Sequence, residues 1–243
     1  MGRVIIVGDA HIDSRGGKRH KQFSFFLDYV LSQKPGTLLL AGDMFEFLHG
    51  NGSWVLNNYQ DIFKKLEDIS KTGTKIFYVY GNHDFDFKLP FSFICSGPEF
   101  NNLNINGLKV RFSHGDGVDP EDKKYHLLKK VLRSKIFRFT ASLIPDFILY
   151  PMASFFSSLS RRADSDPAAL AERSNAYKEH ALCVLKDRSL DVVVYGHTHI
   201  PQICQLQGSK QVYINPGFFG KDASYATIDD INGVYIGIFN KGC

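Results

Sequence analysis

Histidine, aspartate and asparagine side chains gather at five places along this chain, each directly after a short apolar run. The clusters are Asp9-Ala10-His11, Gly42-Asp43, Gly81-Asn82-His83-Asp84, His114-Gly115-Asp116 and Gly196-His197-Thr198-His199. Imidazole nitrogens and carboxylate oxygens are suitable ligands for borderline divalent ions such as manganese, iron, zinc or nickel. A single Asp-x-His would be an ordinary polar turn, but five repeats of one construction predict a shared metal site.

The apolar run before each cluster has the length and composition of a buried β-strand. These runs cover residues 4–7, 38–41, 76–80, 110–112 and 192–195. Helical spacing of apolar residues over 23–31 and 55–69 separates the first three runs, and Pro35-Gly36 and Gly73 end the two helices. Alternating strands and helices predict a layered α/β core with the ligands on loops at the carboxyl ends of the strands.

Dipeptides that favour hairpin turns mark the rest of the chain. Asn106-Gly107 lies between two apolar runs, and a type I′ turn requires the positive φ that both residues tolerate. Gln207-Gly208 and Asn232-Gly233 repeat the signal, so residues 200–239 are expected to form antiparallel strands. The predicted fold is therefore α/β, with two mixed sheets packed face to face and helices outside.

Residues from 119 to about 188 interrupt this pattern because they carry no strand signal. A chain of 243 residues is short enough for one domain that contains this helical insertion. Within 121–162, nine basic and three acidic residues give a balance of 9 − 3 = +6, whereas the whole chain carries +4. Apolar residues occupy one helical face and basic residues the other, which is typical of a helix on a membrane surface.

Residues 139–159 contain a single charge, Asp146, and are long enough to span a bilayer. Pro145, Asp146 and Pro151 lie near the middle of this segment and disfavour a spanning helix. A single crossing would also place His114 and His197 on opposite sides of the membrane. We therefore expect a helical hairpin that lies on the bilayer or caps the site, with an ordinary buried helical insertion as the alternative.

The composition is that of a folded globular protein, with 44% apolar and 22% charged residues. The four cysteines are scattered without a CxxC pair, which indicates neither a zinc knuckle nor a disulfide framework and favours a reducing compartment. Residues 4–7 are too short for the core of a signal peptide, so a cytoplasmic location is expected. The small net charge predicts no nucleic-acid partner, and nothing in the sequence indicates an oligomeric state.

The five clusters, in their order and over nearly the whole chain, resemble the signature of the calcineurin-like metallophosphoesterases. This resemblance implies two divalent metal ions, with manganese the expected metal. A carboxylate has two oxygens and can bridge two ions, so Asp43 is the expected bridge. The implied ligands are Asp9, His11, Asp43 and His199 for the first ion, and Asp43, Asn82, His114 and His197 for the second.

The implied reaction is hydrolysis of a phosphate ester. Two divalent ions supply an activated water and neutralise the phosphoryl oxygens. His83 follows a metal ligand, and we expect it to protonate the leaving oxygen or to stabilise the transition state, with Asp84 orienting its ring. A purely structural role for His83 beside the metals is the alternative.

Finer features resemble the bacterial UDP-2,3-diacylglucosamine diphosphatases of the lipid A pathway. The similar blocks are Gly42-Asp43-Met44-Phe45-Glu46, Asp122-Lys123-Lys124-Tyr125, Arg162-Ala163-Asp164-Ser165 and the spacing of Asn175 and Lys178. The resemblance implies a peripheral enzyme at the inner face of the cell membrane that cleaves UDP-2,3-diacylglucosamine to UMP and 2,3-diacylglucosamine 1-phosphate. The implied substrate contacts are Asn82, Asp122, Ser165, Asn175, Lys178 and His197.

The chain departs from this family at His83, where its best-known branch has arginine, so a relative with another substrate stays open. One alternative is a metallophosphoesterase for a soluble nucleotide or a phosphoprotein, in which the insertion is an interface between proteins. Another is a scaffold that keeps the fold without the chemistry. The complete set of ligand residues argues against the scaffold.

Overall fold

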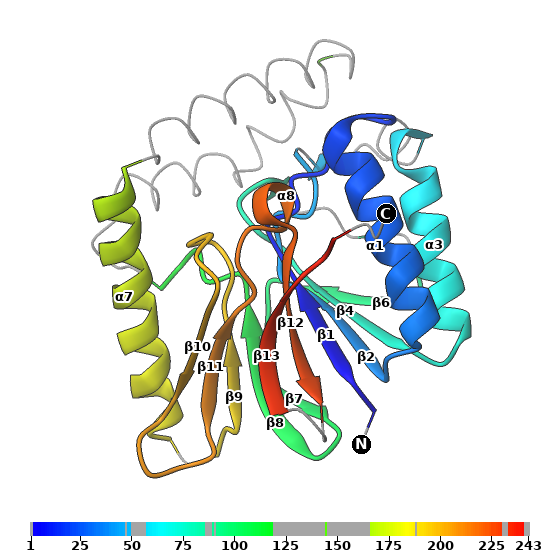
Figure 1. Ribbon diagram of the computed structural model, residues 1–243. Coiled ribbons are helices and arrows are strands. Elements are labelled where there is room, and N and C mark those ends of the chain that lie inside the picture. The colour runs from blue at the N-terminus through cyan, green and yellow to red at the C-terminus, as the bar shows by residue number, and fades with distance from the viewer. Residues whose placement is uncertain are drawn as a thin grey trace.

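The structure is a computed structural model of the 243-residue chain. The residues it describes are 2–46, 48–49, 57–85, 89, 91–118, 144, 166–187, 189–229 and 233–240. Figure 1 shows two sheets side by side, with helices on the outer face of each.

The first sheet has six strands in the order β13-β12-β1-β2-β4-β6. Their bounds are β1 Val4–Val7, β2 Thr37–Leu40, β4 Lys75–Val79, β6 Ile94–Gly97, β12 Ser224–Asp229 and β13 Gly233–Ile238. The strands β1, β2, β4 and β6 run parallel, and β12 pairs antiparallel with β1. The connecting helices α1 (Lys18–Gln33) and α3 (Gln60–Lys71) lie against one face of this sheet.

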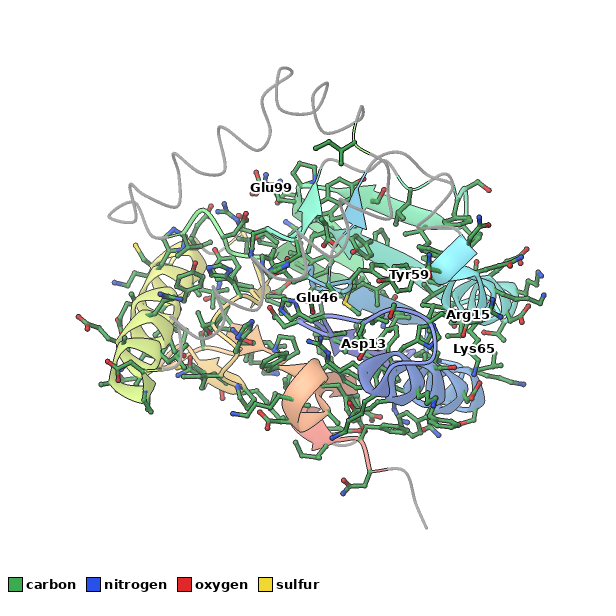
Figure 2. All side chains as sticks on the ribbon, turned by 90° about the horizontal axis from the view of Figure 1, so that it is seen from above. Asp13, Arg15, Glu46, Tyr59, Lys65 and Glu99 are labelled. Carbon is green, nitrogen blue, oxygen red and sulfur yellow. The ribbon has the colours of Figure 1, made fainter. Side chains whose placement is uncertain are left out.

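The second sheet has five strands in the order β10-β11-β9-β8-β7. Their bounds are β7 Glu99–Ile105, β8 Leu108–Ser113, β9 Val192–Val194, β10 Gln202–Gln205 and β11 Val212–Asn215. The central strands β8, β9 and β11 run parallel, and β7 and β10 pair antiparallel at the edges. The helix α7 (Pro167–Leu185) covers the outer face, on the opposite side of the molecule from α1 and α3 (Figure 2).

Three shorter elements complete the described chain. The strands β3 (Leu48–His49) and β5 (Asp84–Phe85) pair in parallel, and α8 (Phe219–Asp222) is a single helical turn.

Alternation along β1 shows how the sequence builds the layers. Val4 and Ile6 face the second sheet, whereas Ile5 and Val7 face the helices α1 and α3. All four side chains are buried, as expected for a strand covered on both faces. The outer face of the second sheet packs on one side of α7 through Tyr177, Ala181 and Leu185. The chain therefore forms four layers, with an apolar core between each pair.

The predicted fold class is confirmed, because the structure has two mixed sheets with helices on both outer faces. Asn106 and Gly107 both have positive φ, 53° and 87°, as the hairpin prediction requires. The single-domain prediction with an insertion at 119–188 stays a prediction: α7 lies inside that range, and most of 121–162, including 139–159 apart from Ile144, falls outside the described residues. Among the described residues, no helix is both long enough and apolar enough to span a bilayer.

Candidate metal centre

The polar clusters meet where strands of the two sheets end. From the first sheet, the loops after β1, β2 and β4 supply the first three clusters, and the loops after β8 and β9 supply the others from the second sheet. Neighbouring loops are held together by their backbones: Asp9 N–H donates to Gly42 O at 3.0 Å, and Gly196 N–H donates to His114 O at 3.0 Å. Backbone hydrogen bonds between neighbouring loops therefore fix the positions of these loops relative to one another.

Five residues of these loops other than glycine have a left-handed backbone. Their φ angles are 50° for Asp9, 41° for His11, 48° for Asp43, 67° for His197 and 61° for His199. Aspartate and histidine enter this region more readily than most residues, but the conformation is uncommon and is kept only where the surroundings enforce it. Backbone strain is thus concentrated in the loops that carry the carboxylates and imidazoles.

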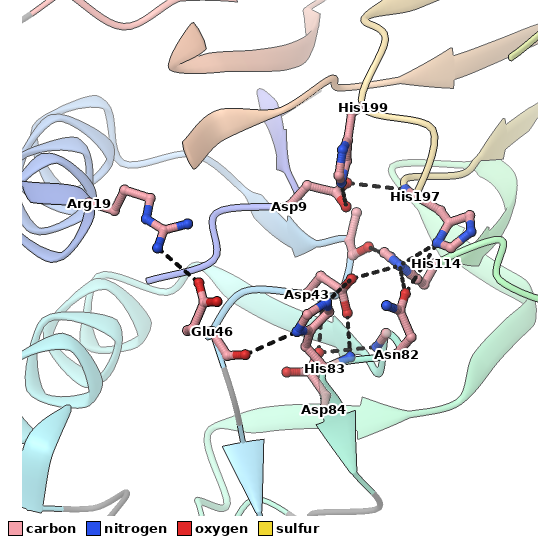
Figure 3. Close-up of polar contacts among 12 residues, drawn as sticks. Asp9, Arg19, Asp43, Glu46, Asn82, His83, Asp84, His114, His197 and His199 are labelled. Carbon is pink, nitrogen blue, oxygen red and sulfur yellow. Dashed lines mark hydrogen bonds and ion pairs between the residues drawn. The ribbon is translucent and has the colours of Figure 1, made fainter. Parts of the chain in front are cut away.

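Side chains from the two sheets contact one another across this centre (Figure 3). His199 Nε2 of the second sheet lies 3.2 Å from Asp9 Oδ1 of the first. The backbone N–H of His197 donates to Asp9 Oδ2 at 3.1 Å. His114 Nε2 lies 3.4 Å from Asp43 Oδ2. Each of the two carboxylates therefore accepts contacts from loops of the second sheet.

Asn82 occupies the side of the centre next to two histidines. Its Oδ1 lies 3.1 Å from His114 Nε2 and 3.2 Å from His197 Nδ1. His114 Nδ1 lies 2.8 Å from Ala41 O. A carbonyl oxygen only accepts, so Nδ1 carries the hydrogen and Nε2 is directed at the centre, which is the usual arrangement of a metal-binding histidine.

Three groups of these side chains have the geometry of metal ligands. The groups are Asp9, His11 and His199; His11, Asp43 and His83; and Asp9, Asp43 and His114, and within each group the ligand atoms lie within 4.8 Å of one another. The donors are nitrogen and oxygen only, a set that suits borderline divalent ions. The residues present thus fit divalent metal binding, without selecting one metal.

The charges of the centre explain why it would attract a cation. Burial opposes ionisation of Asp43, but His114 and His83 hold the pKa of its carboxyl well below the usual value. Burial would lower the pKa of His114, yet Asp43 raises it to about 10. Burial and the neighbouring His114 lower the pKa of His197 to about 3. In the protein alone, His114 therefore keeps a positive charge beside the ionised Asp43.

The Asp84 carboxylate is used differently from what we expected. Its Oδ2 accepts hydrogen bonds from the backbone N–H of Asp43 at 2.9 Å and of Gly81 at 3.0 Å. Burial and the charge of Asp43 raise the pKa of Asp84 to about 7. The His83 ring is instead contacted by Glu46, whose main-chain oxygen lies 3.0 Å from Nδ1. Asp84 thus ties the loops after β2 and β4 together, because its backbone N–H partners lie in both.

Of the expected substrate contacts, Asn175 and Lys178 lie side by side on α7, where Lys178 Nζ donates to Asn175 Oδ1 at 3.3 Å. The same helix reaches the metal centre through Tyr177, a buried ring that stacks on His197 with centroids 5.8 Å apart. Asp122 and Ser165 lie outside the described residues. The other expected contacts, Asn82 and His197, are in the centre itself.

Sequence reasoning missed several residues that support the centre. The Phe218 ring stacks on His199 with centroids 4.4 Å apart. The Tyr177 ring of α7 stacks on His197. Arg19 pairs with Glu46 beside His83. The one available signal was Glu46, an acidic residue that directly follows the apolar Met44-Phe45.

Gly81 leaves room for the Asp43 carboxylate. A Cβ at position 81 would overlap Asp43 Oδ1 and lie 2.6 Å from its backbone nitrogen. We expect Gly81→Ala to displace Asp43, to lower bound metal and hydrolysis about 100-fold, and to destabilise the fold by about 1–3 kcal/mol. Metal analysis and thermal unfolding measure both effects. Gly117→Ala is the matched control, since a Cβ there has nothing within 4 Å, and equal losses in both variants would contradict the steric argument.

Comparison with known proteins bears on what this centre does. A model of the calcineurin-like phosphoesterase family matches residues 2–201. A UDP-2,3-diacylglucosamine hydrolase of Blochmanniella pennsylvanica is 23% identical over 234 residues, covering 94% of this chain and 92% of the relative. The Pseudomonas fluorescens SBW25 protein of the same name is 26% identical over 216 residues, covering 84% and 82%. The structure of an archaeal phosphodiesterase matches over 98% of this chain and 99% of its own chain, with a TM-score of 0.50. The sequence identity is 13%, so this similarity shows the fold alone.

Proposed function

This chain belongs to the calcineurin-like phosphoesterase family and is a metal-dependent phosphoester hydrolase, and from that premise we propose that it hydrolyses the diphosphate bond of UDP-2,3-diacylglucosamine to UMP and 2,3-diacylglucosamine 1-phosphate. The observation that carries the hydrolytic part is the meeting of carboxylate, imidazole and amide side chains from both sheets around one point. The named substrate rests on the names of the relatives.

We assign the metal ligands in the two sets that the family resemblance implied. Asp9, His11, Asp43 and His199 would hold one ion, and Asp43, Asn82, His114 and His197 the other. The short distances from Asp9 to His199, 3.2 Å, and from Asp43 to His114, 3.4 Å, support this division. Manganese is the metal we propose.

The reaction needs a nucleophile, charge neutralisation and a group at the leaving oxygen. Two divalent ions, when bound, lower the pKa of a water molecule and neutralise the phosphoryl oxygens. Asp43 holds the backbone N–H of His83 on its Oδ1 at 2.8 Å, which fixes this histidine beside the centre. His83 Nε2 lies 3.9 Å from Asp43 Oδ2. With both ring nitrogens protonated, His83 donates the Nε2 proton to the leaving oxygen as the P–O bond breaks and keeps the hydrogen on Nδ1.

The lipid half of the substrate would lie along α7 and the segment before it. Asn175 and Lys178 offer an amide and an ammonium next to each other, suited to hydroxyl and phosphate groups of a sugar phosphate. Tyr177, between them in sequence, stacks on His197 and so places this helix against the metal centre. We further propose that Asp122 and Ser165 contact the substrate and that residues 121–162 bind the inner face of the cell membrane from the cytoplasm, as a helical insertion within a single domain.

Release of UMP tests the proposed substrate. Purified protein with Mn²⁺ is expected to form UMP from UDP-2,3-diacylglucosamine in detergent micelles or vesicles, and removal of the metal by a chelator is expected to stop it. Preferred turnover of a soluble cyclic nucleotide or a phosphopeptide, with no UMP formed from the lipid, would instead support the soluble-substrate alternative.

The pair on α7 gives a second, residue-level test. Lys178→Ala is expected to raise the KM for the diacylglucosamine nucleotide about tenfold, the usual effect of losing one charge-assisted hydrogen bond. Hydrolysis of a small aryl phosphodiester should stay within about twofold, because that ester does not reach α7. Glu172→Gln, at an exposed position on the same helix, is the control. A loss on both substrates would show that Lys178 supports the metal centre and not the lipid half.

A further inference from the structure

The ring of His83 is oriented by a main-chain oxygen. His83 Nδ1 lies 3.0 Å from the carbonyl oxygen of Glu46, which can only accept, so Nδ1 carries the hydrogen. The opposite nitrogen, Nε2, then faces the Asp43 carboxylate at 3.9 Å. The direction of Nε2 therefore depends on where the Glu46 carbonyl is held.

Glu46 is held at two further points, one on its main chain and one on its side chain. Its backbone N–H donates to Ile12 O at 3.0 Å. Its carboxylate accepts a hydrogen bond from Arg19 Nη2 at 2.8 Å, and the side chains are 2% and 24% exposed (Figure 3). Little freedom is left for the Glu46 carbonyl to turn, because both the backbone nitrogen and the side chain of this residue are held.

Arg19 is placed by the start of α1. Asp13 accepts hydrogen bonds from the backbone N–H of His20 at 2.9 Å and of Arg19 at 3.4 Å, and its Oδ2 lies 3.9 Å from Arg19 Nε. It satisfies N–H groups that the first turn of a helix leaves without partners. A Cβ at Gly17 would overlap the Asp13 carboxylate, so glycine is needed there. Figure 2 shows Asp13 between α1 and Glu46.

We propose that Arg19 is a positioning residue, which fixes His83 Nε2 at the leaving oxygen through Glu46 while touching neither metal nor substrate. The inference rests on the proposed role of His83. Its physical basis is the contact series Asp13–Arg19–Glu46–His83, which joins the first turn of α1 to the loop after β4. The parallel pairing of β3 with β5, which begin two residues after Glu46 and one after His83, keeps these two loops side by side.

Two substrates whose leaving groups differ in acidity can show whether Arg19 positions His83 or only supports the structure in general. The fully metallated enzyme is given two esters of uridine 5′-phosphate, one with 4-nitrophenol and one with unsubstituted phenol. Nitrophenolate departs readily without a proton, whereas phenolate gains from a proton on the leaving oxygen. A misplaced His83 therefore slows the phenyl ester and spares the nitrophenyl ester.

Arg19→Met is expected to lower kcat on the phenyl ester at least tenfold, to change kcat on the nitrophenyl ester less than about twofold, and to leave KM and bound metal unchanged. Arg19→Lys should recover part of the loss, because it restores the charge without the planar fork. Lys21→Met, an exposed position on the same helix, is the control and should match the unmodified protein. Equal slowing of both esters, loss of metal, or an unchanged kcat in Arg19→Met would overturn the proposal.

Removal of Arg19 alone leaves the Glu46 carboxylate buried without this partner, and the variant could fail to fold for that reason. Arg19→Met/Glu46→Gln removes both charges together and carries the same test. His83→Ala in the same assay separates the two hypotheses. If it slows both esters equally, the role given to His83 fails; if it discriminates between them and the Arg19 variants do not, only the positioning role of Arg19 fails.

Discussion

Asp43→Asn is expected to lower phosphoester hydrolysis by about a thousandfold or more while leaving the fold intact. A shared carboxylate that brings two cations together contributes several kcal/mol to the transition state, and each 1.36 kcal/mol is a factor of ten in rate. Asn keeps the shape of the side chain and tolerates the φ of 48° found here. It removes the charge that the two ions would share.

Turnover and metal content together measure this effect. The unmodified protein is expected to bind two divalent ions per chain by elemental analysis, and Asp43→Asn one or none. Asp28→Asn is a suitable control, because the Asp28 side chain is 52% exposed and pairs with Lys65 on the outside of α1 and α3. Two ions bound with normal activity in Asp43→Asn would refute the bridging assignment.

Metal binding is expected to release a proton from His114 and to raise the thermal stability by about 5–10 °C. The metal-free centre keeps His114 protonated because Asp43 raises its pKa to about 10, and a cation at Nε2 must displace that proton. At neutral pH the apparent affinity should therefore fall about tenfold for each unit of decrease in pH. A cation at a hundred times its Kd adds about 2.7 kcal/mol to the free energy of unfolding. In a chain of this size, each kcal/mol raises the Tm by about 2–4 °C.

The stability of the metal-free protein should fall as the pH rises, whereas its affinity for metal increases. The folded-state pKa of His114 is raised to about 10 and that of Asp84 to about 7, so both groups bind protons more tightly in the folded state than in the unfolded one. Stability from these protons is present at low pH and is lost as the pH rises through the raised values. Chelated protein should therefore lose the contribution of Asp84 between about pH 4 and pH 7, and that of His114 between about pH 6.5 and pH 10.

Calorimetry in buffers of different ionisation enthalpy measures the released proton, and thermal unfolding with and without Mn²⁺ measures the stability. His114→Asn should bind metal with less proton release and should flatten the alkaline loss of stability in the chelated protein. Uptake of metal that releases no proton would contradict the charge balance inferred for the centre.

The secondary structure near the centre was predictable because the signals are local. The apolar run of β1 and the type I′ turn at Asn106-Gly107 depend only on neighbouring residues, and both were found as expected. The partner of a strand is a different matter. Residues 224–229 were expected to form antiparallel strands, and they do, but β12 joins the first sheet beside β1, more than two hundred residues away in sequence. No local pattern encodes that choice.

For the candidate site, the sequence indicated the chemical types but not the contacts that hold them. The five clusters could be identified as candidate ligands from composition and spacing. The orientation of His83 could not, because it depends on Glu46, 37 residues before it, and on Arg19, 27 residues before Glu46. Asp84 was expected to orient His83, since the two are adjacent, yet its carboxylate bonds the backbone of Asp43 and Gly81.

By itself, the sequence determined which side chains could bind a cation, and placed them at the ends of strands, because ligand chemistry and strand patterning are properties of a few adjacent residues. Only the tertiary structure decided that Asp9 would meet the backbone of His197, which lies 188 residues away, and that Arg19 of α1 would reach Glu46, whose carbonyl contacts the His83 ring. The physical reason is that these contacts form only after two sheets bury their shared face, and that burial is a property of the whole chain.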